Sequence, residues 1–485
     1  MMDCQWFAAV NNILDQYFLL TQRGTSVGKE FRAGTASFLT LSYLLLVNPQ
    51  MMEQAGVDHG DAVFATAVSA ALSCFIMGVF ANLPFACAPG LGLSAYLTFG
   101  LVQPQLCTLP EALTVCWWSG IFVFLVSITG MAALLMKVVP QAIKLAIVVG
   151  MGLLIAMIGM VTVGLIVANP KTLVELGVIW GNIDLQLMLA GVVLVASLLY
   201  HDIKGAILIG IVTLTVTSWS IHNDWPSTIV EVPQFAVHCD NWEPMVLFDQ
   251  TKASVLLPAV ASFVLICVFD ISGVMFGLAT LGNIIGPEGD IPGSLWAFVA
   301  SSLGTIVAAW LGSTPIIVCV ECASGVREGG RTGLTAIFMA FYFIASIFLA
   351  PLFSAVPPIA TAPVLVMVGV LMMGESAKIQ WQNMDEALPA FLTILLMPLT
   401  YSITNGMIFG LLAAAAFHFT SGRFIVDGRR AYERCCQKAC DRVDDIVVKV
   451  EKEETELILN TNQASDNGMS SSATLDSSDY GSVYM

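Results

Sequence analysis

Long apolar runs, separated by short polar or turn-rich breaks, fill the chain from about residue 33 to residue 420. A helix needs about 20 predominantly apolar residues to cross roughly 30 Å of hydrocarbon, and runs near that length recur throughout this region. The pattern therefore predicts an all-α polytopic membrane protein. We expect about fourteen transmembrane segments, near 33–54, 61–82, 86–101, 113–136, 142–164, 184–200, 205–221, 254–279, 293–312, 315–326, 333–352, 359–374, 387–402 and 404–420.

The composition agrees with this interpretation. Of the 485 residues, 57% are hydrophobic and 11% are charged, whereas soluble domains contain about 25% charged residues. The sequence contains no phosphate-binding loop with its lysine, no histidine pair at metal spacing and no nucleophile elbow. We therefore expect a protein that is not an enzyme and that has no cofactor, no metal and no nucleic-acid partner.

Basic residues in the loops indicate the orientation. An even number of segments places both termini on one side, and cytoplasmic loops carry an excess of Lys and Arg. The loops on the terminal side hold Lys137, Lys144, Lys204, Arg327, Arg331 and Lys378, whereas those on the other side hold Lys171 and Lys252. We therefore predict cytoplasmic termini, with a lead-in at 1–32, a membrane body at 33–420 and a tail at 421–485. The tail is basic and then acidic, and its polar end is typical of disorder.

Two of the predicted segments are short and interrupted. The third, "NLPFACAPGLGLSAYLTFG" (82–100), and the tenth, "GSTPIIVCVECASGV" (312–326), contain Pro and Gly at points that favour a broken helix with an extended first half. They lie seven segments apart, as an inverted repeat of seven plus seven would place equivalent elements. Paired interrupted helices in matching halves are typical of a transporter binding site near the middle of the bilayer.

Two acids lie within apolar runs. Asp270 lies in "LICVFDISGVMFG" (265–277), and Glu321 lies in "STPIIVCVECASGV" (313–326). A charged side chain at the bilayer centre costs about 2.5–3.5 kcal/mol on insertion scales, so such residues usually have a function. We predict that both bind a small neutral ligand with several N–H groups and that one of them takes up the coupling proton. The alternative is a pair of acids that serve helix packing, either protonated or hydrogen-bonded to the backbone.

Further candidates for ligand binding come from the third and eighth segments. Gly90 and Gly92 allow close backbone approach and expose amides to a ligand, with tight helix packing as the equally supported alternative. Ser94 and Tyr96 are candidate hydrogen-bonding residues. Phe269 and Phe85 are candidate aromatic faces for a planar ring, although ordinary packing is the commoner role of such residues.

Five motifs, in this order, resemble the adenine/guanine permease (AzgA-like) branch of the nucleobase–cation symporter-2 superfamily over residues 27–420. They are "GTASFLTLSYLLLVNPQMMEQAGV" (34–57), "LPFACAPGLGLSAY" (83–96), "FDISGVMFG" (269–277), "ECASGVREGGRTGLTA" (321–336) and "APVLVMVGVLMMG" (362–374). The resemblance implies a uracil-permease-like fold with a core of spans 1–4 and 8–11 and a gate of spans 5–7 and 12–14, often dimeric through the gate. It places the eighth-span acid of the superfamily on Asp270 and the tenth-span acid on Glu321.

The chain also departs from the family pattern. The family usually has Met and Asn where this chain has Leu91 and Ser94, and it has a Thr-rich run where this chain has Pro315, Ile316 and Ile317. It has Thr-Val where this chain has Ile271 and Ser272. The pocket wall is therefore expected to be less polar, with a changed preference among purines.

The resemblance implies a secondary active symporter of the plasma membrane. It would import purine nucleobases of the adenine, guanine and hypoxanthine class, usually with protons, by elevator-like movement of the core against the gate. Two alternatives to this function stay open: an anion exchanger of the same fold and a non-transporting nucleobase receptor. An internal membrane stays open as its location. Sodium coupling and cytokinin-like substrates also stay open.

Overall fold

The computed structural model describes residues 12–131, 140–203, 205–226, 228, 230, 246–247, 249, 252–286 and 290–420. Contacts divide the chain into one unit at Met1–Ala414 and a second at Ala415–Met485. The start of the predicted lead-in, residues 231–245 of the long loop before residue 252, and the predicted tail lie outside the described residues. Within the described part, eight helices are long and apolar enough to cross a membrane.

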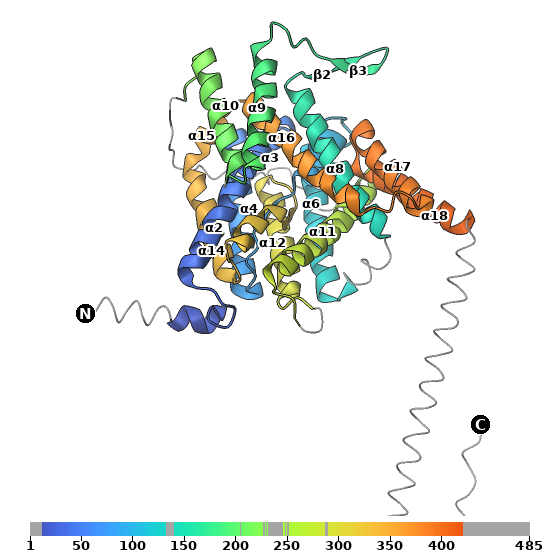
Figure 1. Ribbon diagram of the computed structural model, residues 1–485. Coiled ribbons are helices and arrows are strands. Elements are labelled where there is room, and N and C mark those ends of the chain that lie inside the picture. The colour runs from blue at the N-terminus through green and yellow to red at the C-terminus, as the bar shows by residue number, and fades with distance from the viewer. Residues whose placement is uncertain are drawn as a thin grey trace, which may run out of the picture. The chain divides into compact units, whose positions relative to one another are not determined.

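Helices or interrupted segments lie at each predicted range (Figure 1). The helices of the first half are α2 (Val27–Leu41), α3 (Leu44–Gln54), α4 (His59–Ile76) with a π-helical turn at Met77–Ala81, α6 (Leu109–Ile128), α8 (Gln141–Thr162), α9 (Ile183–Tyr200) and α10 (Ala206–His222). Those of the second half are α11 (Ala253–Gly282), α12 (Ser294–Leu311), α14 (Gly333–Ser346), α15 (Ala350–Ser354), α16 (Pro358–Met373), α17 (Met384–Thr400) and α18 (Ile403–Thr420). A 3₁₀ turn at Ile347–Leu349 joins α14 to α15, and another at Gly374–Lys378 extends α16.

The ends of these helices carry recognisable local signals. The helix α6 starts at a capping box, in which the side chains of Thr108 and Glu111 satisfy each other's backbone amides. The helix α12 ends at Gly312, whose φ of +90° is the left-handed conformation that glycine adopts without steric cost. The start of α6 lies four residues before the predicted start, and both ends of α12 lie within one residue of those predicted, whereas α6 ends eight residues before its predicted end.

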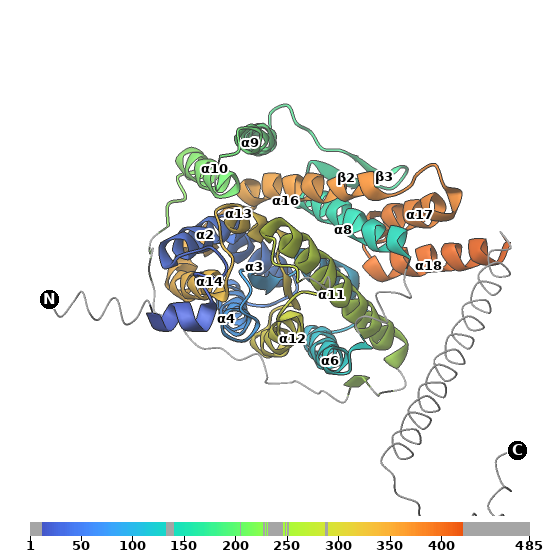
Figure 2. The same cartoon turned by 60° about the horizontal axis from the view of Figure 1, so that its bottom comes forward.

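The helices of Met1–Ala414 pack in two sets (Figure 2). One set contains α2, α3, α4, α6, α11, α12 and α14, and the other contains α8, α9, α10, α16 and α17. Small residues let α8 and α16 approach closely, because a Cβ added to Gly152 would lie 2.7 Å from Met372 Cβ and 3.1 Å from the Gly369 carbonyl oxygen. A Cβ added to Gly159 would similarly lie 2.8 Å from Leu365 Cβ. Glycine is therefore required along this seam.

The third and tenth segments meet as two paired strands. Strand β1 (Cys87–Pro89) runs antiparallel to β4 (Ile316–Val318), with Ala88 opposite Ile317. After β1 the chain continues as α5 (Leu91–Ala95) and a π-helical turn, Tyr96–Val102. After β4 it continues as a 3₁₀ turn, Val320–Cys322, and α13 (Ala323–Arg327). Each segment is thus short and begins extended, as Pro and Gly predicted, and the pairing satisfies backbone groups that no helix could satisfy here.

Two features were not predicted. The first span is interrupted between α2 and α3, where Ser42 and Tyr43 form a turn. Neither residue is Gly or Pro, so the sequence carries no signal for this break. The second feature is a hairpin between α8 and α9, in which β2 (Ile166–Asn169) pairs with β3 (Leu173–Leu176) (Figure 1). The all-α prediction for the membrane body is confirmed, and this hairpin lies between two predicted spans, which end at 164 and resume at 184.

Candidate functional site

Glu321 lies in the turn that follows β4, where the extended part of the tenth segment becomes helical. Its side chain is partly buried. The Glu321 backbone carbonyl accepts hydrogen bonds from Thr40 Oγ1 at 3.3 Å and from Ser324 Oγ at 2.9 Å. These two hydroxyls also contact each other at 2.9 Å. The end of α2 therefore anchors the backbone on which the Glu321 carboxylate is mounted.

Tyr43 fixes the carboxylate itself. Its hydroxyl donates a hydrogen bond to Glu321 Oε1 at 2.6 Å, within the range of an O–H bond to a carboxylate. The tyrosine side chain is 1% exposed and lies at the break between α2 and α3. Sequence reasoning missed Tyr43, because a tyrosine in an apolar span is equally consistent with packing. The residue lies at the unpredicted turn in the first span, and its hydroxyl contacts the tenth segment.

Asp270 lies on the neighbouring helix α11, which packs against β4 and α13. Its side chain is partly buried and makes no hydrogen bond or ion pair with any residue that the structure describes. Among the described residues, no hydrogen bond joins Asp270 to Glu321, whose Oε1 is bonded to Tyr43. The structure thus places the two predicted acids on adjacent elements of one helix set.

The polar groups of Gly90 and Ser94 are already paired within the protein. The Gly90 amide donates to the Pro315 carbonyl at 3.1 Å. Ser94 is fully buried, and its hydroxyl donates to Asn48 Oδ1 at 2.6 Å and contacts Thr314 Oγ1 at 2.7 Å. In this conformation both residues join the third segment to its neighbours. Sequence reasoning did not anticipate Asn48, which links this network to two further buried hydroxyls, those of Thr66 at 2.8 Å and Ser313 at 3.2 Å.

The remaining predicted residues are distributed around the strand pair. A Cβ added to Gly92 would lie 2.7 Å from Met151 Sδ of α8, so this glycine marks a close contact between the two helix sets. Tyr96 is 4% exposed, and its hydroxyl accepts a hydrogen bond from Thr404 of α18 at 2.6 Å. Phe85 is fully buried.

Phe269 lies beside Asp270 on α11 and is 7% exposed. The Nζ atom of Lys144, on α8, lies 5.5 Å from the centroid of the Phe269 ring. This is the distance of a cation–π contact, and it joins one helix set to the other. The ring face that was expected for a planar ligand is therefore next to a cation in this conformation.

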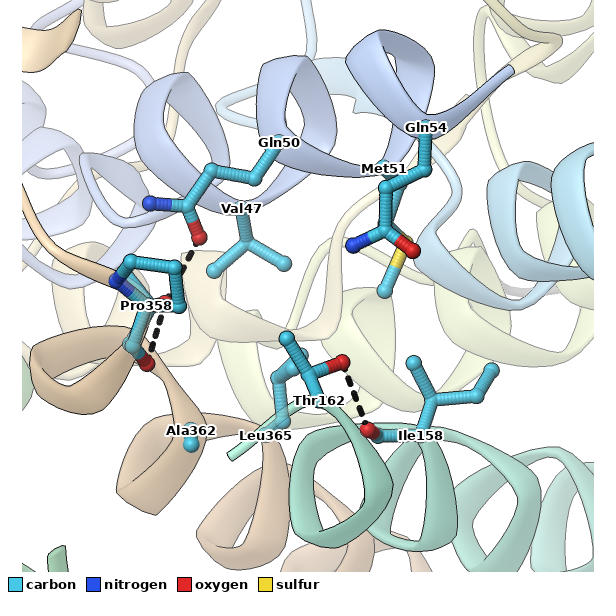
Figure 3. Close-up of a pocket in the computed structure, with 10 residues that line it drawn as sticks. Val47, Gln50, Met51, Gln54, Ile158, Thr162, Pro358, Ala362 and Leu365 are labelled. Atoms are coloured by element: carbon cyan, nitrogen blue, oxygen red, sulfur yellow. Dashed lines mark hydrogen bonds between the residues drawn. The ribbon is translucent and has the colours of Figure 1, made fainter. Parts of the chain in front are cut away.

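A separate small pocket lies between α3 of the first set and α8 and α16 of the second (Figure 3). Its lining residues are Val47, Gln50, Met51, Gln54, Ile158, Thr162, Pro358, Thr361, Ala362 and Leu365. Gln50 bridges the two sets here, because its Oε1 accepts from Thr361 Oγ1 at 2.6 Å. Its Nε2 donates to the Val356 carbonyl at 3.1 Å. The two helix sets are thus held together at this end of α3.

Comparison with known proteins identifies the family. Residues 28–409 match the family described as "Permease family". The chain belongs to this family. It is 33% identical to the adenine permease AdeP of Escherichia coli over 85% of this chain and 92% of AdeP. It is 34% identical to the guanine/hypoxanthine permease PbuO of Bacillus subtilis over 82% of this chain and 92% of PbuO. The resemblance to the AzgA-like branch is therefore confirmed.

A solved structure shares the fold. The transmembrane domain of a cyanobacterial bicarbonate transporter, BicA, aligns with a TM-score of 0.60 at 16% identity, covering 79% of this chain and 97% of that domain. At this identity the likeness concerns the fold alone. The chain is accordingly a multi-pass integral membrane protein of a transporter family, and the expectation that it is not an enzyme is confirmed.

Proposed function

We propose that this protein is a secondary active symporter that imports purine nucleobases together with protons. The observation that carries the proposal is the Glu321 carboxylate, partly buried beside the strand pair and held by one neutral hydroxyl. Such a carboxylate attracts N–H donors and repels anions. A purine base presents N–H groups along a planar edge, and the relatives AdeP and PbuO are named as adenine and guanine/hypoxanthine permeases.

The proposed binding mode assigns separate roles to the two acids. Glu321 accepts hydrogen bonds from the ring N–H groups, in charge-assisted bonds that are stronger than bonds between neutral groups. Asp270, which has no polar partner among the described residues, holds the coupling proton or a further edge of the base. The strand pair β1–β4 holds the two half-helices in position around the ligand.

The proposed transport step is a movement of one helix set against the other. The set containing β1, β4, Glu321 and Asp270 would be the moving core, and the set built on α8 and α16 would be the gate. We further propose fourteen membrane crossings in two inverted halves, cytoplasmic termini, a plasma-membrane location and a homodimer formed through the gate. The contacts that cross between the sets, at Gln50 and at Lys144, would then change during transport.

Uptake by the full-length chain tests the function. Cells that lack endogenous purine uptake and express the chain should accumulate labelled adenine or guanine, faster with an inward proton gradient and slower with a protonophore. A panel of unlabelled purines, pyrimidines, cytokinins, bicarbonate and sulfate should show competition by purines and none by anions. Anion exchange without purine uptake would reject the proposal, and saturable purine binding without counterflow in proteoliposomes would favour a receptor instead.

A further inference from the structure

We propose that Tyr43 is a positioning residue for purine recognition, whose hydroxyl holds Glu321 Oε1 so that the carboxylate presents its other oxygen to the substrate. This inference rests on the proposed function. It assigns to the break in the first span a role that neither the sequence pattern nor the relatives' names suggest. Tyr43 would act through Glu321, without touching the substrate itself.

The hydrogen bond between Tyr43 and Glu321 is short and lies largely inside the protein. Tyr43 Oη lies 2.6 Å from Glu321 Oε1, and the tyrosine ring is 1% exposed whereas the glutamate is partly buried. A buried tyrosine hydroxyl needs a polar partner, and Glu321 Oε1 is the one hydrogen-bond partner that the described residues offer it. Among the described residues, the Tyr43 hydroxyl therefore bonds to this carboxylate alone, and it approaches the carboxylate from the protein interior.

The neutrality of the support matters for the chemistry. A Lys or Arg at this place would neutralise Glu321 and compete with the substrate N–H groups for its oxygens. A phenol hydroxyl fixes one oxygen and leaves the negative charge in place. The backbone carbonyl of Glu321 is held separately by Thr40 and Ser324, so Tyr43 controls the direction of the side chain and not the position of the backbone.

The local fold explains how a residue of the first span reaches the tenth segment. The chain turns at Ser42 and Tyr43 between α2 and α3, with Tyr43 in a helical conformation directly before α3 begins. The helix α2 also packs against α13, directly after the turn that carries Glu321. The end of α2 and Tyr43 thus approach the same turn of the tenth segment, one through α13 and one through Glu321 Oε1.

The first test is removal of the hydroxyl alone. Tyr43→Phe keeps the ring and its packing but loses the donor, and we expect the KM for labelled adenine to rise about 10-fold, as for loss of a hydrogen bond to a charged group. Vmax per transporter at the membrane should stay within about twofold, because the protein still folds and moves. Tyr43→His, which keeps an N–H donor on a planar ring, should recover part of the lost affinity.

The matched control is Tyr342→Phe. The Tyr342 hydroxyl contacts Thr35 Oγ1 at 2.8 Å, so this variant also removes a tyrosine hydroxyl bonded to the first span, at a distance from Glu321. Its KM should equal that of the wild type. An equal rise in KM for the Tyr342 and Tyr43 variants would overturn the inference, because a general weakening of the first span would then explain both.

A double-variant cycle tests whether Tyr43 acts through Glu321. Glu321→Asp shortens the side chain by one methylene group and withdraws it from Tyr43, so Tyr43→Phe should add little further loss in that background. Losses that multiply would overturn the inference. If Glu321 variants fail while Tyr43→Phe has the KM of the wild type, this inference alone falls. If the wild type neither binds nor carries purines, the proposed function falls and the inference falls with it.

Discussion

The two interrupted segments, 87–102 and 316–327, share a backbone plan and differ in chemistry. Each begins as a short strand, pairs with the other and then turns into a short helix. The third segment carries no carboxylate, and its Ser94 is fully buried in a network of hydroxyls and one amide. The tenth segment places Glu321 where it is partly exposed. We therefore propose that the third segment supplies the frame and that the tenth segment supplies recognition of the substrate.

The largest effect should follow removal of the carboxylate from the tenth segment. Glu321→Ala should lower purine uptake at subsaturating substrate by about 30-fold or more, because charge-assisted hydrogen bonds contribute about 1.5–3 kcal/mol. The variant should reach the membrane at the level of the wild type. Initial rates of labelled adenine uptake measure the effect.

The matched control for that variant is Glu53→Gln. Glu53 is exposed and pairs with His59 at 2.9 Å, at the end of α3. An exposed pair contributes about 0–1 kcal/mol, so uptake should change little. If the Glu321 and Glu53 variants transported equally well, the assignment of recognition to the tenth segment would be wrong.

The next largest effect concerns the strand pair β1–β4, which joins the third segment to the tenth. A Cβ at Gly90 would lie 2.8 Å from Ile317 Cδ1 across the strand pair, so the branched side chain in Gly90→Val should displace Ile317 and Leu93 and reduce uptake about 10-fold. The double variant Gly90→Val/Ile317→Ala should recover much of the activity, because it removes the Ile317 atoms that clash. Uptake rates and thermal unfolding in detergent measure both. No recovery in the double variant would count against close packing as the cause.

A smaller effect is expected from the buried network behind the third segment. Asn48→Ala should lower the free energy of unfolding by about 1–3 kcal/mol, because Ser94, Thr66 and Ser313 would lose their shared partner. Ser94→Ala should cost less, since Asn48 Oδ1 keeps Thr314 Oγ1 at 3.4 Å. Thermal unfolding of the purified variants measures this order. If the KM of Asn48→Ala or Ser94→Ala rose as much as that of Glu321→Ala, the network would instead be in direct contact with the substrate.

The smallest effect should come from the bridge between the helix sets. Gln50→Ala removes two hydrogen bonds between α3 and the α16 side, each contributing about 0.5–1.5 kcal/mol, so counterflow should speed up about two- to fivefold with KM unchanged. Thr162→Ala is the control. Thr162 lines the same pocket, and among the described residues its hydroxyl bonds to Ile158 of its own helix, so counterflow by Thr162→Ala should keep the rate of the wild type. Equal counterflow rates in Gln50→Ala and Thr162→Ala would show that the Gln50 hydrogen bonds do not limit the movement of the two helix sets.

The sequence predicted those features that a short stretch of residues determines by itself. Asp270 and Glu321 stood out because an acid in an apolar run is expensive, and the interrupted segments stood out because Pro and Gly disfavour continuous helix. The contact of Tyr43 with Glu321 joins residues 278 positions apart and depends on a break without Gly or Pro. The Asn48 network also depends on partners from several segments. Such contacts arise from the tertiary arrangement, which periodicity along the chain does not encode.

The most direct test of the account is equilibrium binding of adenine and its N-methylated derivatives to the purified full-length protein, wild type and Glu321→Ala. Methylation at N9 removes the ring N–H of adenine, and methylation at N6 removes the amino N–H donors one at a time, so the series removes the donors that Glu321 would accept. The account predicts that the wild type binds at least one methylated derivative about 30-fold more weakly than adenine, and that Glu321→Ala discriminates less than about threefold. Equal discrimination by the two proteins would contradict it.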